Sequence, residues 1–150
     1  MKRLSITLAA LATILVTGTA FGGSGVDTLV KGSHSAVKQI TMKDFHSQAD
    51  LDAFMATAFD KGHAPDLGTV DWTKNMVLAV FAGYQQHSGY QLRITKVDDS
   101  GDVIQVSWKV IVPCQEKSGA DESQPFLFVT YPASTKTVDF NAPDQENQHC

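Results

Sequence analysis

The spacing of hydrophobic residues changes along this chain, and the change constrains the fold more than any other feature of the sequence. Between residues 48 and 60, apolar side chains recur every three or four positions, which is the spacing of one buried face of a helix. These residues are Leu51, Phe54, Met55, Ala58 and Phe59. After residue 75, apolar side chains alternate with polar ones or form short unbroken runs, as they do in β-strands. The sequence therefore predicts one helix followed by a β-rich region.

The predicted helix has both a start signal and a stop signal. Ser47 stands before the apolar stripe and Asp50 follows three residues later, which resembles a capping box with Asp in place of the usual Glu. Gly62 follows the stripe and supplies the stop. We therefore expect a helix over residues 48–60 whose stripe, including Phe54, packs in the core.

The predicted strands differ in how many of their faces are apolar. Residues 76–82 are continuously apolar, as expected of a central strand that is covered on both faces. Residues 104–112 alternate, with Trp108 in the apolar row, and the Asp-Asp-Ser-Gly-Asp segment before them predicts a hairpin turn over residues 98–102. The other predicted strands cover residues 35–40, 90–95, 126–131 and 137–140.

About six strands and one packed helix define the expected fold class. It is mainly β (α+β), an antiparallel β-sandwich or rolled sheet with the helix packed on one side.

The first twenty residues have the composition of a secretory signal peptide. Lys2 and Arg3 form a basic head, residues 4–16 are almost uncharged, and Gly18, Thr19 and Ala20 form a small-residue cleavage site. The apolar run of about thirteen residues is shorter than the roughly 20 that a membrane span needs. An uncleaved anchor is the alternative. We expect cleavage after Ala20 and an exported protein, either periplasmic or secreted.

Cleavage would leave an acidic chain of the size of one domain. The mature chain would keep 10 of the 12 Lys and Arg residues and all 16 Asp and Glu residues, a formal charge of −6. Nucleic acids and anionic membranes are poor partners for this charge. We expect a flexible leader over residues 21–33, one β-rich domain over residues 34–140 and a polar tail over residues 141–150.

Two cysteines in an exported chain predict a disulfide between Cys114 and Cys150. The bridge would close a loop of 37 residues, and the chain-entropy model gives such a loop roughly 4 kcal/mol of stabilisation, less any strain. The alternative is that Cys150 is unpaired in the polar tail. No Cys-x-x-Cys spacing occurs, so the sequence does not support redox catalysis.

The chemistry-bearing residues form no recognisable catalytic motif. The five histidines show none of the His-x-His, His-x-x-x-His or His-Glu-x-x-His spacings of metal sites. These histidines are His34, His46, His63, His87 and His149. Neither the Gly-x-Ser-x-Gly motif of hydrolases nor the Gly-x-Gly-x-x-Gly motif of dinucleotide sites occurs. We therefore expect a protein that is not an enzyme and has no cofactor or metal.

Three stretches resemble the C-terminal domain of the PrcB protease-complex subunits. They are an Asp-aromatic pair and strand over residues 70–83, a turn and strand over residues 88–97, and the Pro-aromatic pair Pro125-Phe126. The resemblance covers about residues 34–140. Ser88 departs from the usual Gly-Gly-Tyr turn, and the lipid-anchor cysteine of the founding subunit is absent. The resemblance implies an accessory role beside an exported subtilisin-like protease and no catalytic residues.

The predicted binding site is the loop over residues 84–89, with help from residues 114–124. In an antiparallel meander, successive connections alternate between the two ends of the sheet, so these two loops are expected to share one end. The candidate binding residues are Tyr84, His87, Ser88, Gly89 and Tyr90. Tyrosines offer a large contact area at low entropic cost. For Gly89 and Tyr90 the alternative is structural, with the glycine serving the turn and the tyrosine packing in the core.

Two functions follow from these residues. The first is an exported, non-catalytic domain that binds a protein partner as a stabiliser, chaperone or inhibitor associated with a protease. The alternative is a periplasmic protein that binds a small molecule or a metal through His63, His87 and acids brought together by folding.

Overall fold

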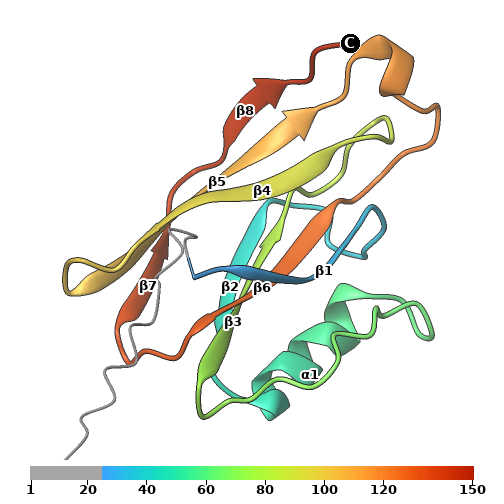
Figure 1. The fold of residues 1–150 in the computed structure, drawn as a ribbon. Coiled ribbons are helices and arrows are strands. Elements are labelled where there is room, and N and C mark those ends of the chain that lie inside the picture. The colour runs from blue at the N-terminus through green and yellow to red at the C-terminus, as the bar shows by residue number, and fades with distance from the viewer. Residues whose placement is uncertain (1–24) are drawn as a thin grey trace, which may run out of the picture.

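A computed structural model describes residues 25–150, which form two β-sheets and one α-helix (Figure 1). The predicted signal peptide lies outside the described residues. The elements in chain order are β1 (Asp27–Gly32), β2 (Thr41–Phe45), α1 (Gln48–Ala58), β3 (Asn75–Phe81), β4 (Gln91–Asp98), β5 (Val103–Val112), a 3-10 turn η1 (Gln115–Lys117), β6 (Phe126–Pro132), β7 (Thr137–Phe140) and β8 (Asp144–Asn147).

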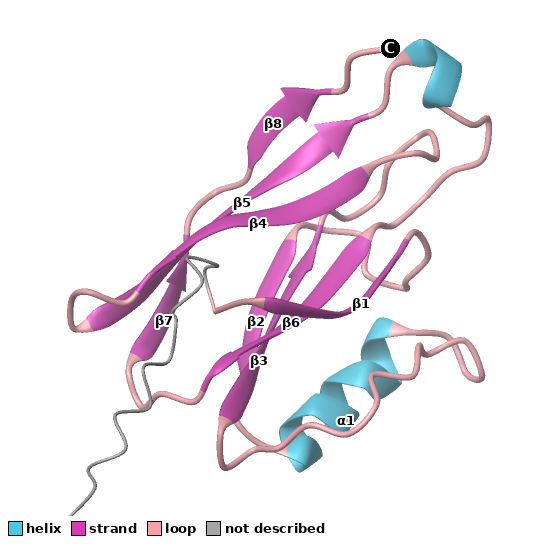
Figure 2. Cartoon of the chain, in the orientation of Figure 1, coloured by secondary structure: helices cyan, strands magenta, loops and turns pink. Residues whose placement is uncertain are grey.

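The first sheet lies between the second sheet and the helix (Figure 2). Its strand order is β1-β6-β3-β2, and all of its pairs are antiparallel. Residues 76–81 of β3 have no exposed surface. Leu78 and its alternate neighbours pack toward the second sheet, whereas Val77 and its alternate neighbours pack toward α1. The prediction of a central strand covered on both faces is confirmed.

The second sheet combines antiparallel and parallel pairs. β4 and β5 form the predicted antiparallel hairpin, and Trp108 of β5 is buried between the sheets, where its indole N–H donates to the carbonyl of Asn141 (3.0 Å). β7 and β8 each pair with β5 in parallel. β6 ends at the same end of the sandwich at which β5 begins. After β6 the chain crosses to the second sheet, so β7 and β8 run in the same direction as β5. The expected sandwich with one packed helix is confirmed, but this sheet is mixed rather than antiparallel.

The helix begins and packs as the sequence predicts. The Ser47 side chain accepts a hydrogen bond from the backbone N–H of Asp50 (3.2 Å) and donates one to its carboxylate (2.8 Å). The helix ends at Ala58, two residues earlier than expected, because Phe59 is extended. The ring of Phe59 packs against Phe126 at a centroid distance of 4.9 Å. Phe54 is half-buried and packs between Phe45 and Phe81.

Three strands, β1, β2 and β8, lie where no strand was expected. The predicted strand at residues 35–40 is wrong, because this segment is an irregular connection between β1 and β2. Residues 27–32, expected within the flexible leader, form β1 on the edge of the first sheet, and residues 144–147 of the predicted tail form β8. β1 and β8 are edge strands that bury few side chains, so their sequences lack the strong alternation of half-buried strands.

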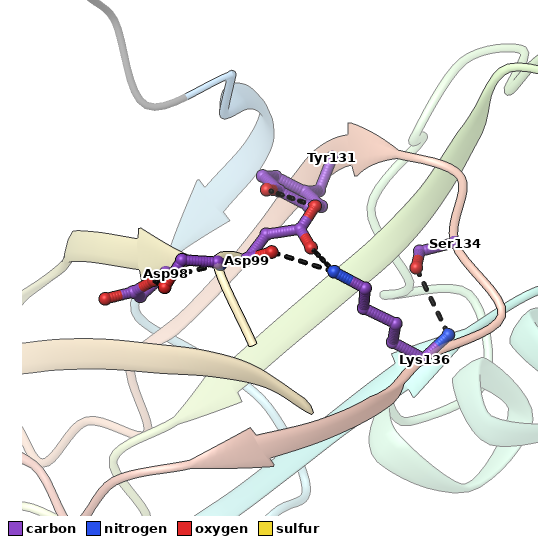
Figure 3. A network of polar contacts seen from close by, with 6 residues as sticks. Asp98, Asp99, Tyr131, Ser134 and Lys136 are labelled. Carbon is purple, nitrogen blue, oxygen red and sulfur yellow. Dashed lines mark hydrogen bonds and ion pairs between the residues drawn. The ribbon is translucent and has the colours of Figure 1, made fainter. Parts of the chain in front are cut away.

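A polar network closes the end of the sandwich at the β4–β5 turn (Figure 3). The ammonium of Lys136 donates to the backbone carbonyl of Asp99 (2.8 Å) and forms an ion pair with its carboxylate. The hydroxyl of Tyr131 also donates to this carboxylate (3.5 Å). Burial, and then the nearby charge of Asp99, raises the pKa of Tyr131. These contacts join the β4–β5 turn to the β6–β7 connection.

Asp98 belongs to the same turn and is held by its own neighbours. Its carboxylate accepts hydrogen bonds from the side chain (2.6 Å) and the backbone N–H (3.1 Å) of Ser100, and it pairs with Lys96 (3.1 Å). The hydrogen bond from the Ser100 side chain is the main cause that holds the pKa of Asp98 well below its ordinary value.

Candidate functional site

Three loops meet at the end of the sandwich opposite the polar network. They connect β1 to β2 (residues 33–40), β3 to β4 (residues 82–90) and β5 to β6 (residues 113–125), and we call them the loop cluster. The second and third loops are the two that the sequence predicted to share one end, and this proximity is confirmed. The first loop was not expected to join them.

Backbone hydrogen bonds hold the loop cluster together. Gln85 and Ser123 exchange two of these bonds (2.8 and 3.0 Å), and the N–H of Gly119 donates to the carbonyl of Ser88 (3.3 Å). The N–H of Tyr84 donates to the carbonyl of Lys38 in the first loop (3.1 Å). Because backbone groups make these contacts, exposed side chains such as Tyr84 and His87 are not needed to hold the loops together.

Two further bonds fix the third loop. The predicted disulfide between Cys114 and Cys150 is present, with Cα atoms 6.0 Å apart, and it ties the segment after β8 to the loop. Ser123 is fully buried, and its hydroxyl donates to the carbonyl of His87 (2.7 Å). The disulfide is compatible with an oxidising, exported location.

Gly89 has a structural role within the loop cluster. Its φ is +100°, and a Cβ atom there would lie 2.5 Å from the carbonyl oxygen of Lys117 and 3.0 Å from the Pro113 side chain. A side chain at this position would therefore push the second and third loops apart. Tyr90 is half-buried and packs against the core between the sheets. For both residues, the geometry agrees with the structural alternative stated above.

Of the other predicted binding residues, Tyr84 and His87 are exposed and Ser88 is half-buried. The phenol of Tyr84 lies beside the Glu122 carboxylate, and hydrogen bonding to this group raises the pKa of Tyr84 above its ordinary value. An acidic residue of the third loop therefore stands next to this tyrosine.

Ile40 adds an apolar residue that the sequence analysis missed. Among residues 25–150, Ile40 (53% exposed) and Tyr84 (47%) are the large hydrophobic residues that are exposed. They come from neighbouring segments, since Tyr84 bonds to Lys38 and a Cβ at Gly83 would lie 2.9 Å from the backbone of Gln39. Ile40 alternates with polar residues like a buried strand residue, so no local signal distinguishes it. We call this pair of side chains the Ile40–Tyr84 surface.

The two histidines of the metal-binding alternative, His63 and His87, line different pockets. His63 lines a pocket with His34 and Asp60, whereas His87 lines a different pocket with Tyr90. Within the described part of the chain, no three His, Cys, Asp or Glu side chains are placed to hold a metal ion. The structure therefore does not bring together the ligand set that the metal-binding alternative requires.

One short motif has the Ser-x-x-Lys spacing that some hydrolases use, formed by Ser35 and Lys38. On a helix this spacing would place both side chains on one face. Here the segment is irregular, and the Ser35 hydroxyl accepts a hydrogen bond from the backbone N–H of Val37 (3.3 Å). The motif therefore acts as a local turn rather than as a nucleophile with its base.

Comparisons with known proteins give no match, either to a family model, to a curated protein or to a solved structure. The resemblance to the PrcB family therefore depends on the motifs alone. Among the described residues, no helix has the length and hydrophobicity needed to cross a membrane.

Proposed function

We propose that this chain is an exported, non-catalytic domain that binds a protein partner through the loop cluster. The observation that carries the proposal is the Ile40–Tyr84 surface, which presents the exposed large hydrophobic residues of the described chain on two neighbouring segments. Aromatic residues are enriched among the side chains that dominate protein–protein binding energies.

The backbone of the loop cluster supports the same function. Loops held in place by hydrogen bonds and a disulfide lose little conformational entropy on binding, which favours affinity. Tyr84 and His87 are both exposed on the second of these loops. We propose that they contact the partner, with Ile40 beside them.

The partner that we propose is an exported subtilisin-like protease or a protein that it processes. The support is the motif resemblance to PrcB subunits, together with a disulfide that is compatible with export. In this proposal the domain stabilises, assists or inhibits its partner and contributes no catalytic residue.

Capture from the envelope fraction of the source cells tests the proposal. The exported protein, immobilised without reductant, is compared with the double variant Ile40→Ala/Tyr84→Ala and with the control Thr135→Ala/Thr137→Ala, which changes exposed residues at the opposite end. We expect the first variant to keep the melting temperature of the wild type and to bind the partner at least tenfold more weakly, or 1.4 kcal/mol. The double variant Tyr84→Ala/His87→Ala should show the same loss.

Two outcomes would contradict parts of the proposal. Unchanged capture by the Ile40 and Tyr84 variant would place the interface elsewhere on the protein. A partner that mass spectrometry identifies as unrelated to any protease would remove the proposed association while leaving protein binding in place.

A further inference from the structure

The sandwich is open along the side where β1 and β4 lie. β1 ends the order of the first sheet and β4 ends that of the second, so neither has a neighbour on its outer side. Two cavities of about 230 and 290 Å³ lie between these strands, and both are lined by Lys31, Gln91 and Leu92. They therefore form one continuous depression, which we call the edge groove.

The edge groove consists of two small compartments, each with apolar side chains among the residues that line it. Leu127 and Val129 of β6 line the first compartment, and Phe126 and Tyr90 line the second. Each compartment is smaller than the roughly 300 Å³ at which small-molecule sites begin. Side chains of an extended chain, which project alternately, fit a row of compartments beside a strand edge.

The rim of the edge groove is positively charged, although the protein as a whole carries a formal charge of −4. Lys31 and Arg93 line it, and no described Asp or Glu is among its lining residues. Neither cation takes part in an ion pair within residues 25–150, and Glu146, whose pKa Arg93 helps to lower, is paired with Lys109. The uncompensated charge is complementary to an acidic ligand.

The strand edges beside the groove are regular over a short length. β4 pairs with β5 without interruption from Gln91 to Ile94, and a register shift follows before Lys96. β1 has its own shift between Thr28 and Val30. A free edge of about four residues offers backbone donors and acceptors to one short strand, whereas the irregularities beyond it prevent longer pairing.

We propose that an extended acidic segment of a partner protein binds in the edge groove as an added strand on β4. Its apolar side chains enter the two compartments, and its carboxylates lie at Lys31 and Arg93. This inference rests on the proposed protein-binding function and specifies the chemistry of the partner. Tyr90 lines both the edge groove and the pocket at His87, so a partner on the loop cluster can extend into the groove.

Selection from a display library of random twelve-residue peptides tests this inference. The target is the exported, disulfide-intact protein, and the variant is Lys31→Glu/Arg93→Glu. Lys43→Glu/Lys61→Glu is the control, because it makes the same change in net charge at exposed residues outside the groove. Enriched peptides are synthesised, and their affinities are measured by fluorescence anisotropy at low and high salt.

We expect the wild type and the control to enrich peptides that alternate apolar residues with Asp or Glu. These peptides should bind Lys31→Glu/Arg93→Glu at least tenfold more weakly, and salt should weaken their binding to the wild type. The inference would be overturned if the wild type enriched no peptides, or only peptides without Asp or Glu. The two cations would then serve only to prevent the free strand edges from pairing with other chains. Equal affinity of the enriched peptides for the groove variant would overturn it as well.

The variant Ile40→Ala/Tyr84→Ala separates this inference from the proposed function. We expect it to retain the peptide selection of the wild type while losing capture of the protein partner. A wild type that captures the partner through the loop cluster but shows no preference for acidic peptides would remove the edge groove as a site and leave the loop cluster in place. Persistent capture by the Ile40 and Tyr84 variant would contradict the proposed function without affecting the groove.

Discussion

The two ends of the sandwich are held together by different kinds of bonds. At the polar network, the charged side chains of Asp99 and Lys136 join two connections by an ion pair and hydrogen bonds. At the loop cluster, backbone hydrogen bonds and the Cys114–Cys150 disulfide join three loops. At the first end, charged and polar side chains bind to one another, whereas the second end leaves Tyr84 and Ile40 exposed.

This difference is the reason that we propose the loop cluster, and not the more highly charged polar network, as the binding surface. The polar network is the more conspicuous of the two ends, yet its groups already have partners within the chain. A binding surface needs groups whose best partners lie outside the molecule. In the loop cluster, backbone hydrogen bonds and the disulfide provide internal contacts, while Tyr84, His87 and Ile40 are exposed.

Removal of the disulfide should have the largest effect and should separate the two ends. In the variant Cys114→Ser/Cys150→Ser, the chain-entropy model predicts a loss of up to about 4 kcal/mol in the free energy of unfolding. Hydrogen exchange should increase in β8 and residues 113–125 and remain unchanged at the β4–β5 turn. Equal protection of β8 with and without the bridge would show that strand pairing alone holds this segment.

The same glycine substitution at each end should give opposite results. Gly89→Ala introduces a Cβ that meets the Lys117 carbonyl at a φ of +100°, so we expect a loss of about 3 kcal/mol. At the other end, a Cβ at Gly101 would have no atom within 4 Å. Gly101→Ala should leave stability unchanged or raise it by about 0.5 kcal/mol. Urea unfolding of both variants measures the difference, and similar losses would contradict the comparison.

The ion pair of the polar network should have a smaller and salt-dependent effect. Lys136→Met removes the partner of Asp99, but both side chains are more than a third exposed. Solvent screening therefore limits the expected loss to about 0.5–1 kcal/mol. Urea unfolding at 0.15 M and 1 M NaCl should show that the loss shrinks at high salt. A loss that does not depend on salt would assign the effect to packing of the lysine side chain.

The smallest expected effect is the response of the polar network to acid. Because the folded-state pKa of Asp98 is lowered, its ionised form stabilises the fold above its unfolded-state pKa of about 4, and this contribution disappears as the pH falls toward the folded-state pKa. Asp98→Asn should therefore show a shallower loss of stability than the wild type between about pH 4 and pH 2. Asp102→Asn controls for net charge. An identical pH dependence of the wild type and Asp98→Asn would contradict the role of Asp98.

The central elements of the fold were predictable from the sequence because burial leaves a strong pattern. Residues of β3 are buried on both faces, those of β5 on one face, and those of α1 along one stripe, so the period of each element is visible. β8 has four exposed residues and shows no such pattern. Its parallel pairing with β5 depends on the crossover after β6, which local spacing does not encode.

The candidate site was predictable only in part for the same reason. The proximity of residues 84–89 and 114–124 follows from the order of strands in the sheet. The first loop was missed because residues 35–40 were predicted to form a strand, so Ile40 was not placed in a connecting loop. Gly89 has its structural role because the Lys117 carbonyl lies close to it, and Tyr90 has its role because it packs against the core. Only the three-dimensional structure shows these contacts.

The double burial of β3 has a consequence for folding kinetics. Neighbouring residues on this strand report on different interfaces, since Val77 packs toward α1 and Leu78 packs toward the second sheet. Truncation of each to Ala and measurement of folding and unfolding rates would give two φ-values from adjacent positions on one backbone. Their ratio would tell whether the helix or the second sheet docks first, because the local strand structure is common to both probes.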